Sequence, residues 1–248
     1  MRFVFSINFN KNQVISLNDV KSSGLRNAVI SVIKEALKQK EVNLFQEYWG
    51  NKSKNIVKPF TFAYYANKLK QEKSKSCVNY QFEGDLRVNV SSHDYSFLVA
   101  IYNSLIKLKE YQIFGEKINL CQFSLRQQKD IDSNKVLFKI LSPFVVRKTE
   151  NKKGNGYLSI EDSDFEESLF YQVKNLSANY LKIDLDRNQF SIETEQCKTI
   201  KITHYKEIIP ATSGQIKIKA PVEVLKLLYD SGLGARRSQG FGMLEVIR

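Results

Sequence analysis

Hydrophobic and polar positions alternate at the start of the chain. Large apolar side chains occupy every second position there: Phe3, Phe5, Ile7 and Phe9. This period of two predicts a strand with one face turned toward a core. From Leu25 to Leu37 the apolar residues recur every three or four positions instead. That spacing predicts an amphipathic helix whose apolar stripe packs on a sheet.

The rest of the first half adds strands and a second helix. Strands are predicted over residues 60–65 and 77–90. A helix is predicted to begin near Ser91 or Ser92, because apolar residues then recur at helical spacing: Phe97, Leu98, Ile101, Leu105 and Leu108. A strand over residues 118–125 completes the order β-α-β-β-α-β, which is the order of a ferredoxin-like unit.

The second half begins with a broken strand and a helix. Residues 136–146 are predicted to form a strand interrupted at Pro143, and residues 148–162 a loop. Residues 163–166, Ser-Asp-Phe-Glu, have the spacing of a capping box. A capping box followed by an apolar run predicts the start of a helix.

A hairpin and a last helix follow. Alternating runs at residues 200–203 and 216–219 predict two strands, and residues 210–214 the turn between them. Pro221 suits the first turn of the final helix. The second half thus repeats β-α-β-β-α-β. We predict an α+β fold of two tandem ferredoxin-like (βαββαβ, RRM-like) domains, residues 1–127 and 128–248.

Charge is what sets the composition apart. Across 248 residues, 42% hydrophobic and 26% charged residues are ordinary for a folded domain, but 38 Lys and Arg against 26 Asp and Glu give a net charge of +12. Such an excess favours a polyanionic partner, either nucleic acid or an anionic membrane surface. No apolar run approaches the ~20 residues of a membrane-spanning helix, and the alternating N-terminus is unlike a signal peptide.

The cysteines predict neither a disulfide framework nor a zinc site. Cys77, Cys121 and Cys197 are odd in number and far apart in the sequence. We therefore expect a cytoplasmic, nucleic-acid-binding protein that needs no metal and no other cofactor.

Residues 232–246 carry the most informative local pattern. Four glycines form two Gly-apolar-Gly triplets separated by five residues: Gly232, Gly234, Gly240 and Gly242. Glycine adopts positive φ readily, so such a loop can present its backbone N–H groups to an anion. Arg236 and Arg237, between the triplets, carry guanidinium groups that suit phosphate oxygens.

Two commoner glycine motifs do not fit this stretch. A nucleotide P-loop needs Gly-Lys-Ser/Thr, but Phe241 follows Gly240. A dinucleotide fingerprint needs a third glycine where Arg237 stands. The plain alternative is a helix C-cap at Gly232 followed by a glycine-containing turn.

The triplet spacing between a last helix and a last strand resembles the signature of the CRISPR repeat-processing ribonucleases of the RAMP superfamily. The likeness extends to the start Met1-Arg2-Phe3 and to Leu141-Ser142-Pro143 with Val145-Val146-Arg147-Lys148. The resemblance implies two tandem ferredoxin-like domains and a metal-independent cut in the repeat of a precursor CRISPR RNA. The 2′-hydroxyl attacks the adjacent phosphate, which leaves a 2′,3′-cyclic phosphate. The implied partner is the CRISPR repeat RNA, and other Cas effector-complex subunits or a homodimer stay open.

The catalytic residues depart from the family pattern. In many members a histidine just after the first helix, beside a glutamate, acts with a tyrosine and a lysine. Here Gln46 and Glu47 stand at the His-Glu position, Lys52 falls on the lysine, and the first helix has no tyrosine at 29–33. A glutamine cannot exchange protons near neutral pH, and loss of a general acid–base costs about 10²–10⁴ in rate.

Two roles are open for the residues after Gln46. Tyr48 is a candidate proton donor or 2′-hydroxyl positioner, and Lys52 a candidate for stabilising the phosphorane charge. Alternatively, Tyr48 and Trp49 pack or stack on bases, and Lys52 only contacts a phosphate. Of the two histidines, His93 is expected to be a solvated helix-end residue. His204 shares a strand face with two isoleucines and is expected to be partly buried, yet it is the better candidate for a catalytic histidine.

RNA binding is expected at the glycine-rich stretch and the neighbouring hairpin. Arg236, Arg237 and Ser238, with the loop amides, are predicted to hold a segment of repeat RNA. Weaker candidates lie on the hairpin: Lys201, Lys206, Lys217 and Lys219.

Three functions are carried forward. The first is a CRISPR repeat endoribonuclease, and the second a protein that binds the repeat without cutting it, which Gln46 favours. The third is a structural RAMP subunit of an effector complex. A generic RNA-binding protein with two ferredoxin-like halves is less favoured, because no strand carries an RNP1-like run of aromatics.

Overall fold

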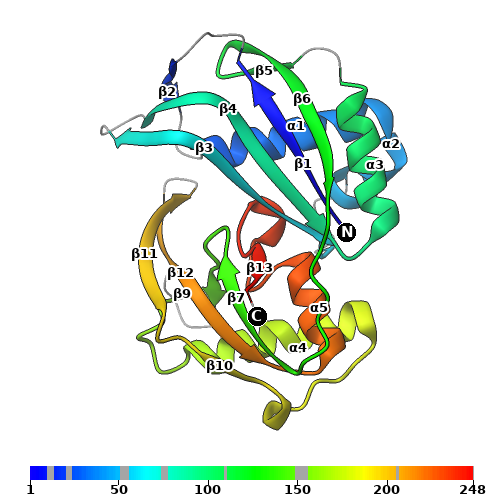
Figure 1. Cartoon of the computed structure of the whole chain (residues 1–248), viewed down its shortest axis with the longest axis vertical. Helices are drawn as coiled ribbons and strands as arrows, with labels where there is room; N and C mark the ends of the chain where they lie inside the picture. The colour runs from blue at the N-terminus through cyan, green and yellow to red at the C-terminus, as the bar shows by residue number, and fades with distance from the viewer. Residues whose placement is uncertain are drawn as a thin grey trace. The chain divides into compact units, whose positions relative to one another are not determined.

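The computed structural model describes residues 1–9, 14–20, 24–50, 56–73, 78–108, 111–148, 156–204 and 207–247. The chain divides into two compact units. Unit 1 consists mainly of Met1–Pro59 and Ala63–Gln127, and unit 2 mainly of Phe60–Phe62, Gln128–Thr203 and Glu207–Arg248. The backbone of each unit is drawn in Figure 1.

Unit 1 is built on an antiparallel sheet with helices. Its strands are β1 (Arg2–Asn8), β2 (Val14–Val20), β3 (Phe60–Lys73), β4 (Val78–Ser92), β5 (Tyr111–Ile113) and β6 (Glu116–Arg126). They follow the order β2-β4-β1-β6-β5, and β3 also pairs with β4. The helices are α1 (Gly24–Lys40), α2 (Val42–Phe45) and α3 (Tyr95–Ile106), and α1 packs beside α3. Strand β1 thus lies between β4 and β6, as the first strand of a ferredoxin-like unit does.

The central strand is buried on both faces, which the sequence pattern did not predict. Phe3, Phe5 and Ile7 are fully buried, as expected from their alternation. On the other face, Arg2 and Ser6 are buried as well. The alternating pattern predicts that Ser6 faces solvent. Its hydroxyl is buried instead, and it donates a hydrogen bond to Oε1 of Gln122 on β6 at 2.9 Å, which satisfies this polar group.

Several predicted boundaries in unit 1 were wrong. No helix was predicted for residues 46–50, but they form one π-helical turn, η1 (Gln46–Gly50), directly after α2. Gly50 ends this turn, and the side-chain Oε1 of Gln46 occupies the space where a Cβ at position 50 would lie. Helix α3 begins at Tyr95, not at residue 91 or 92, and Asp94 caps it by accepting the N–H of Phe97 at 2.9 Å.

Unit 2 repeats the same order of elements. Its strands are β7 (Lys135–Ile140), β10 (Ser191–Glu193), β11 (Cys197–His204), β12 (Glu207–Lys219) and β13 (Leu244–Val246), with β8 (Val146–Arg147) and β9 (Tyr157–Leu158) as a separate pair. The sheet runs β10-β12-β7-β13, and β11 pairs with β12. Its helices are α4 (Phe165–Leu181) and α5 (Val222–Ser231), with a 3₁₀ turn, η3 (Arg237–Gln239), inside the glycine-rich stretch.

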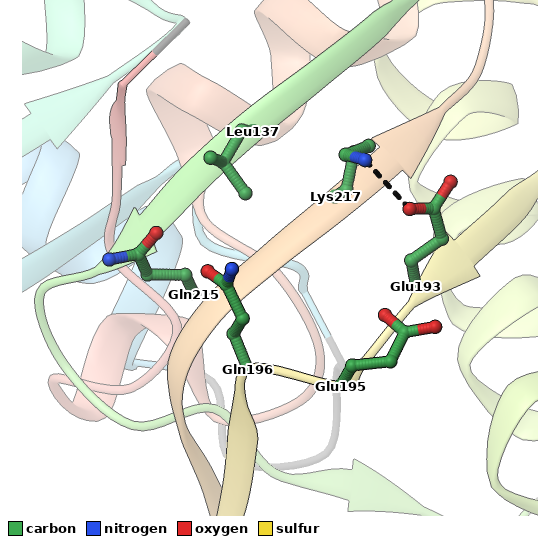
Figure 2. A pocket seen from close by; sticks show the side chains of 6 residues that line it. All are labelled: Leu137, Glu193, Glu195, Gln196, Gln215 and Lys217. Carbon is green, nitrogen blue, oxygen red and sulfur yellow. Dashed lines mark hydrogen bonds and ion pairs between the residues drawn. The ribbon is translucent and has the colours of Figure 1, made fainter.

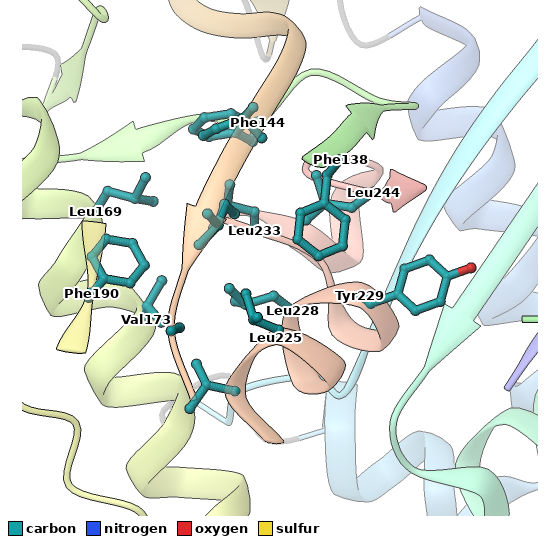
Figure 3. Packing of buried hydrophobic residues seen from close by; sticks show 14 of the residues in the cluster. Phe138, Phe144, Leu169, Val173, Phe190, Leu225, Leu228, Tyr229, Leu233 and Leu244 are labelled. Atoms are coloured by element: carbon teal, nitrogen blue, oxygen red, sulfur yellow. The ribbon is translucent and has the colours of Figure 1, made fainter. Parts of the chain in front are cut away.

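The two faces of the unit 2 sheet differ in polarity. One carries Leu137, Lys217 and Glu193 from three adjacent strands (Figure 2). The other packs against α4 and α5, and its core is shown in Figure 3. That core includes Phe138, Phe144, Leu169, Leu225, Leu228, Leu233 and Leu244. The hydrophobic core therefore fixes the ends of α5 and β13, between which the glycine-rich stretch lies.

Two local predictions in unit 2 were wrong. Residues 210–214, expected as a turn, lie within β12, where Ile209 and Ala211 are buried on either side of Pro210. Proline, serine and glycine favour turns by local preference, but here pairing keeps the segment extended: β12 pairs with β11, and Thr212 exchanges backbone hydrogen bonds with Phe144. The capping box is also absent, since Asp164, not Ser163, precedes α4 and makes no side-chain cap.

The α+β fold of two tandem ferredoxin-like units is confirmed. Among the described residues, no helix combines the length and the apolar character needed to cross a lipid bilayer.

Candidate nucleic-acid interface

The two glycine triplets lie against each other. Gly232 ends α5 with a φ of +85°, and its N–H donates to the carbonyl of Leu228 at 2.8 Å. The N–H of Leu233 donates to the carbonyl of Gly242 at 2.8 Å. A Cβ on Gly242 would lie 1.9 Å from the Leu233 carbonyl oxygen, and one on Gly232 would lie 2.9 Å from the Gly242 oxygen. Glycine is therefore required in both triplets by their close backbone approach.

The same stretch is tied to residues 142–145. The N–H of Ala235 donates to the carbonyl of Val145 at 2.8 Å, and the N–H of Gly242 to the carbonyls of Ser142 and Pro143. A Cβ on Gly234 would lie 2.5 Å from the Val145 oxygen. The two segments that carry the family resemblance in this half thus form one packed structure.

This packing corrects the expectation that the loop amides as a group are available to RNA. The N–H groups of Gly232, Leu233, Ala235, Gly240 and Gly242 all donate to backbone carbonyls. Within the described part of the chain, the N–H groups of Gly234 and of residues 236–238 have no such acceptor. Within this stretch, the backbone N–H groups that can donate to a ligand are therefore those of Gly234 and of the residues at the start of η3.

Arg236 is held in a defined and partly exposed position. Its backbone is left-handed, with a φ of +56°. Its guanidinium lies over the ring of Tyr157 on β9, 5.4 Å from the centroid, and Nε donates to the Tyr157 hydroxyl. Nη1 donates to Oε1 of Gln239 at 3.0 Å. A guanidinium held in this way loses little conformational entropy on binding a phosphate.

Arg237 does not fit its predicted role as a phosphate ligand. Its side chain is buried, and Nη1 donates to the carbonyl of Ser231 in the last turn of α5 at 3.2 Å. Burial lowers the pKa of Arg237 to about 10. The last carbonyls of a helix lack intrahelical partners, so Arg237 satisfies one of them and ties η3 to α5. Ser238, next to it, is partly exposed.

The hairpin lysines differ in how far their charges are compensated. Nζ of Lys217 lies 2.8 Å from the carboxylate of Glu193 (Figure 2). The same carboxylate also binds Lys135, at 2.6 Å. Hydrogen bonds from Lys135 and Lys217 lower the pKa of Glu193 to about 2. Lys201 and Lys219 are exposed and make no ion pair with a described residue. Lys206 lies outside the described residues.

A shallow pocket of about 160 Å³ adjoins this ion-pair group. It is lined by Leu137, Glu193, Glu195, Gln196, Gln215 and Lys217 (Figure 2). Two of its six lining residues are carboxylates, so it is less suited to a phosphate than the exposed lysines are.

In unit 1, three aromatic residues next to Gln46 in the sequence and two lysines form what we call the Trp49 cluster: Lys34, Phe45, Tyr48, Trp49 and Lys58. The ring of Phe45 stacks on that of Trp49 with centroids 5.9 Å apart, and the Tyr48 ring lies 6.1 Å from it at a steep angle. Nζ of Lys34, from α1, lies 6.0 Å from the Trp49 ring centroid, and Nζ of Lys58 lies 5.3 Å from it. The sequence prediction named Tyr48 and Trp49 but neither lysine.

The titratable groups of the cluster are perturbed. Burial lowers the pKa of Lys34, and burial together with the charge of Lys34 lowers the pKa of Lys58. Burial, with the charges of Glu47 and Asp94, raises the pKa of Tyr48. Tyr48 therefore stays protonated at neutral pH and can donate a proton or a hydrogen bond. Its ring also packs edge-on to Phe97, with centroids 4.9 Å apart.

The remaining predicted residues are dispersed. Gln46 is exposed at the start of η1, and Lys52 lies outside the described residues. His204 is more deeply buried than expected at the end of β11, and His93 is partly exposed before α3. Among described residues, no cluster of three or more His, Cys, Asp or Glu side chains could hold a metal ion.

Comparison with known proteins gave one family match. Residues 126–246 match the model of the family described as CRISPR associated protein Cas6, C-terminal. The match covers the hairpin, α5, the glycine-rich stretch and β13. No curated protein sequence matches the chain.

Several solved structures are similar to the whole chain. A RAMP protein described as binding different RNA substrates has a TM-score of 0.76 at 18% identity, with all of both chains covered. A Cas6-related protein from Pyrococcus furiosus has a TM-score of 0.77 at 19% identity, covering 100% of this chain and 98% of that one. A CRISPR associated protein Cas6 has a TM-score of 0.71 at 17% identity, covering 100% and 99%. At such low identities the similarity is one of fold.

Proposed function

Because residues 126–246 match the model of the Cas6 C-terminal family, we propose that the chain is a Cas6-type CRISPR-associated protein that binds the repeat of precursor CRISPR RNA and cleaves it there. The single observation that carries the proposal is the family match over residues 126–246, which contain the glycine-rich stretch. The net charge of +12 agrees with an RNA ligand. RNA is also what one structural neighbour is described as binding.

The proposed reaction is an internal transesterification. The 2′-oxygen attacks the adjacent phosphorus, the bond from phosphorus to the 5′-oxygen of the next nucleotide breaks, and that oxygen takes up a proton. The products are a 2′,3′-cyclic phosphate and a 5′-hydroxyl. The reaction needs a base, an acid and positive charge near the phosphorane, and it requires no metal.

We assign the proton-donating role to Tyr48, because its hydroxyl is protonated at neutral pH and lies in the turn that begins at Gln46. Its raised pKa makes it a weaker acid than an ordinary tyrosine, so we expect slow cleavage. Lys52 would supply charge near the phosphorane. Gln46 stands where family members carry a histidine and cannot exchange a proton, so its amide would only position a group by hydrogen bonding. His204 is the alternative catalytic histidine, although its burial argues for a structural role.

For RNA binding, Arg236 and Ser238 with the free amides of residues 236–238 are the strongest candidates, followed by Lys201 and Lys219. The glycines 232, 234 and 242 support this surface by their close packing, and Gly240 by the hydrogen bond of its N–H to the Arg237 carbonyl. Lys217 is a weaker candidate, because Glu193 partly neutralises its charge. Arg237 contributes indirectly, because its hydrogen bond to the Ser231 carbonyl holds the glycine-rich stretch against α5. We assign these RNA contacts to a C-terminal domain, residues 128–248, and the chemistry to residues 1–127.

The second candidate function is binding of the repeat without cleavage, which Gln46 favours. The third candidate is a structural subunit that acts beside other Cas proteins or as a homodimer. In that case the repeat RNA would be bound only when those partner chains are present.

The test is incubation of the purified protein, in excess over the repeat RNA of its neighbouring CRISPR array, in EDTA. The expected result is one cut with a cyclic 3′ end. Replacing the attacking 2′-hydroxyl by hydrogen should abolish the cut. Tight binding without a cut would favour the second function, and no binding in the absence of other Cas subunits would favour the third.

A further inference from the structure

We propose that Lys34 and Lys58 form a binding site for a phosphodiester group of the bound RNA above the ring of Trp49. The inference rests on the proposed function, because it names where that RNA is held in unit 1. The two ammonium groups lie 6.0 and 5.3 Å from the same ring centroid. They come from α1 and from the segment before β3, so the fold brings together two charges that are distant in the sequence.

The site has an unbalanced positive charge. Neither lysine makes an ion pair with a described residue, and no described carboxylate raises the pKa of either one. The acidic groups that act on this turn, Glu47 and Asp94, affect Tyr48 instead. A half-buried pair of like charges is costly unless an anion joins it.

A phosphodiester suits this arrangement, and the ribose and base attached to it set it apart from a simple carboxylate. It carries one negative charge and two free oxygens, so one oxygen can face each ammonium group. The aromatic wall of Phe45 and Trp49 offers an apolar surface to the ribose or base beside that phosphate. The cluster also adjoins Tyr48, the group assigned to proton donation.

The competing explanation is packing. The aliphatic parts of lysine side chains cover aromatic surfaces in many proteins without binding a ligand. Methionine preserves most of that apolar contact and removes the charge. Lys34→Met and Lys58→Met therefore separate the two explanations, and Lys38→Met is the matched control, because Lys38 is exposed on the same helix.

Trp49 is the only tryptophan in the chain, so tryptophan fluorescence reports on this site alone. We would titrate the full-length protein with the repeat RNA carrying a 2′-deoxy nucleotide at the cut, and follow Trp49 fluorescence and the anisotropy of a labelled RNA together. The fluorescence change should saturate at the same RNA concentration as the anisotropy. Lys34→Met and Lys58→Met should each weaken binding by about tenfold. Each should also reduce the slope of log affinity against log salt by about 0.7.

The outcomes are distinct. If the anisotropy reports binding while the fluorescence is unchanged, and both variants behave like Lys38→Met, the inference is wrong and the proposed function stands. If no RNA binding occurs at any salt concentration, the proposed function is wrong and the inference with it. Should one variant fail to fold by circular dichroism, the other carries the test.

Discussion

Arg236 and Arg237 are neighbours in the sequence, yet their guanidinium groups have different surroundings. Arg236 is partly exposed over Tyr157, whereas Arg237 is buried against the carbonyl of Ser231. Arg236→Met should weaken binding of repeat RNA by about tenfold and leave the thermal midpoint unchanged. Arg237→Met should lower the free energy of unfolding by about 1–3 kcal/mol, because it removes the buried hydrogen bond that the guanidinium donates to the Ser231 carbonyl. Calorimetry and RNA anisotropy on both variants check this, and equal effects of the two on stability would contradict it.

Position 46 is where a single residue can change the chemistry. Gln46→His would introduce an imidazole with an ordinary pKa near 6.5, which can exchange protons at neutral pH. If this turn adjoins the reacting phosphate, the single-turnover rate should rise by up to about 10²-fold. The pH–rate profile should also gain a limb near pH 6.5 that the natural chain lacks.

Gln46→Asn is the control for that change, since it keeps an amide and adds no titratable group. Equal rates for the histidine and asparagine variants, with RNA binding intact, would mean that residue 46 does not face the reacting phosphate.

At the scale of elements, the glycine-rich stretch behaves as a packed part of unit 2. Gly242 has a φ of +77°, and a Cβ there would meet the Leu233 carbonyl. Gly115, in the turn between β5 and β6, has a similar φ of +82° but nothing within 4 Å of a Cβ. Gly115→Ala should cost only the left-handed strain of about 1–2 kcal/mol. Gly242→Ala should cost about 1–3 kcal/mol more, through overpacking.

Calorimetric unfolding of the two variants gives the comparison, and anisotropy should report weaker RNA binding for Gly242→Ala alone. Equal losses of stability would mean that the close approach of the two triplets is easily relieved.

The elements that the sequence predicted well are those whose burial follows a local period. Helix α1 and strand β1 were predicted because their apolar residues recur at spacings that a core must cover. The edge strands β2, β5 and β10 were missed, because they exist through pairing with a neighbour. Strands β5 and β10 also carry few buried residues of their own. The turn η1 was missed because π-helical geometry has no clear sequence pattern.

The candidate site was predictable to a similar extent. The position of the glycine-rich stretch was clear from its spacing, but the direction of each arginine depends on partners that the fold supplies. Arg237 binds a carbonyl at the end of α5, and Arg236 packs on Tyr157. The Trp49 cluster was only half predicted, since Lys34 and Lys58 meet through the packing of α1 with the segment before β3. No local pattern distinguishes these lysines from the other basic residues of the chain.

At the scale of the whole molecule, the net charge of +12 predicts that the affinity for RNA depends strongly on salt concentration. Each phosphate neutralised by the protein releases counterions, so log affinity should fall linearly with log salt by about 0.7–0.9 per phosphate. With roughly six to ten such contacts, the affinity would drop by about 10³–10⁵ between about 50 and 200 mM salt. Anisotropy titrations over this range, with the repeat RNA and with a scrambled RNA of equal length, measure both slope and specificity.

The two RNAs should give similar slopes and different intercepts. Phosphate contacts are independent of sequence, whereas contacts to unpaired bases distinguish the repeat from its scrambled version. A flat salt response would contradict the electrostatic account of binding. Similar slopes with equal intercepts would instead mean that the protein binds RNA through its charge without recognising the repeat, and the proposed role in repeat processing would then have to come from partner subunits.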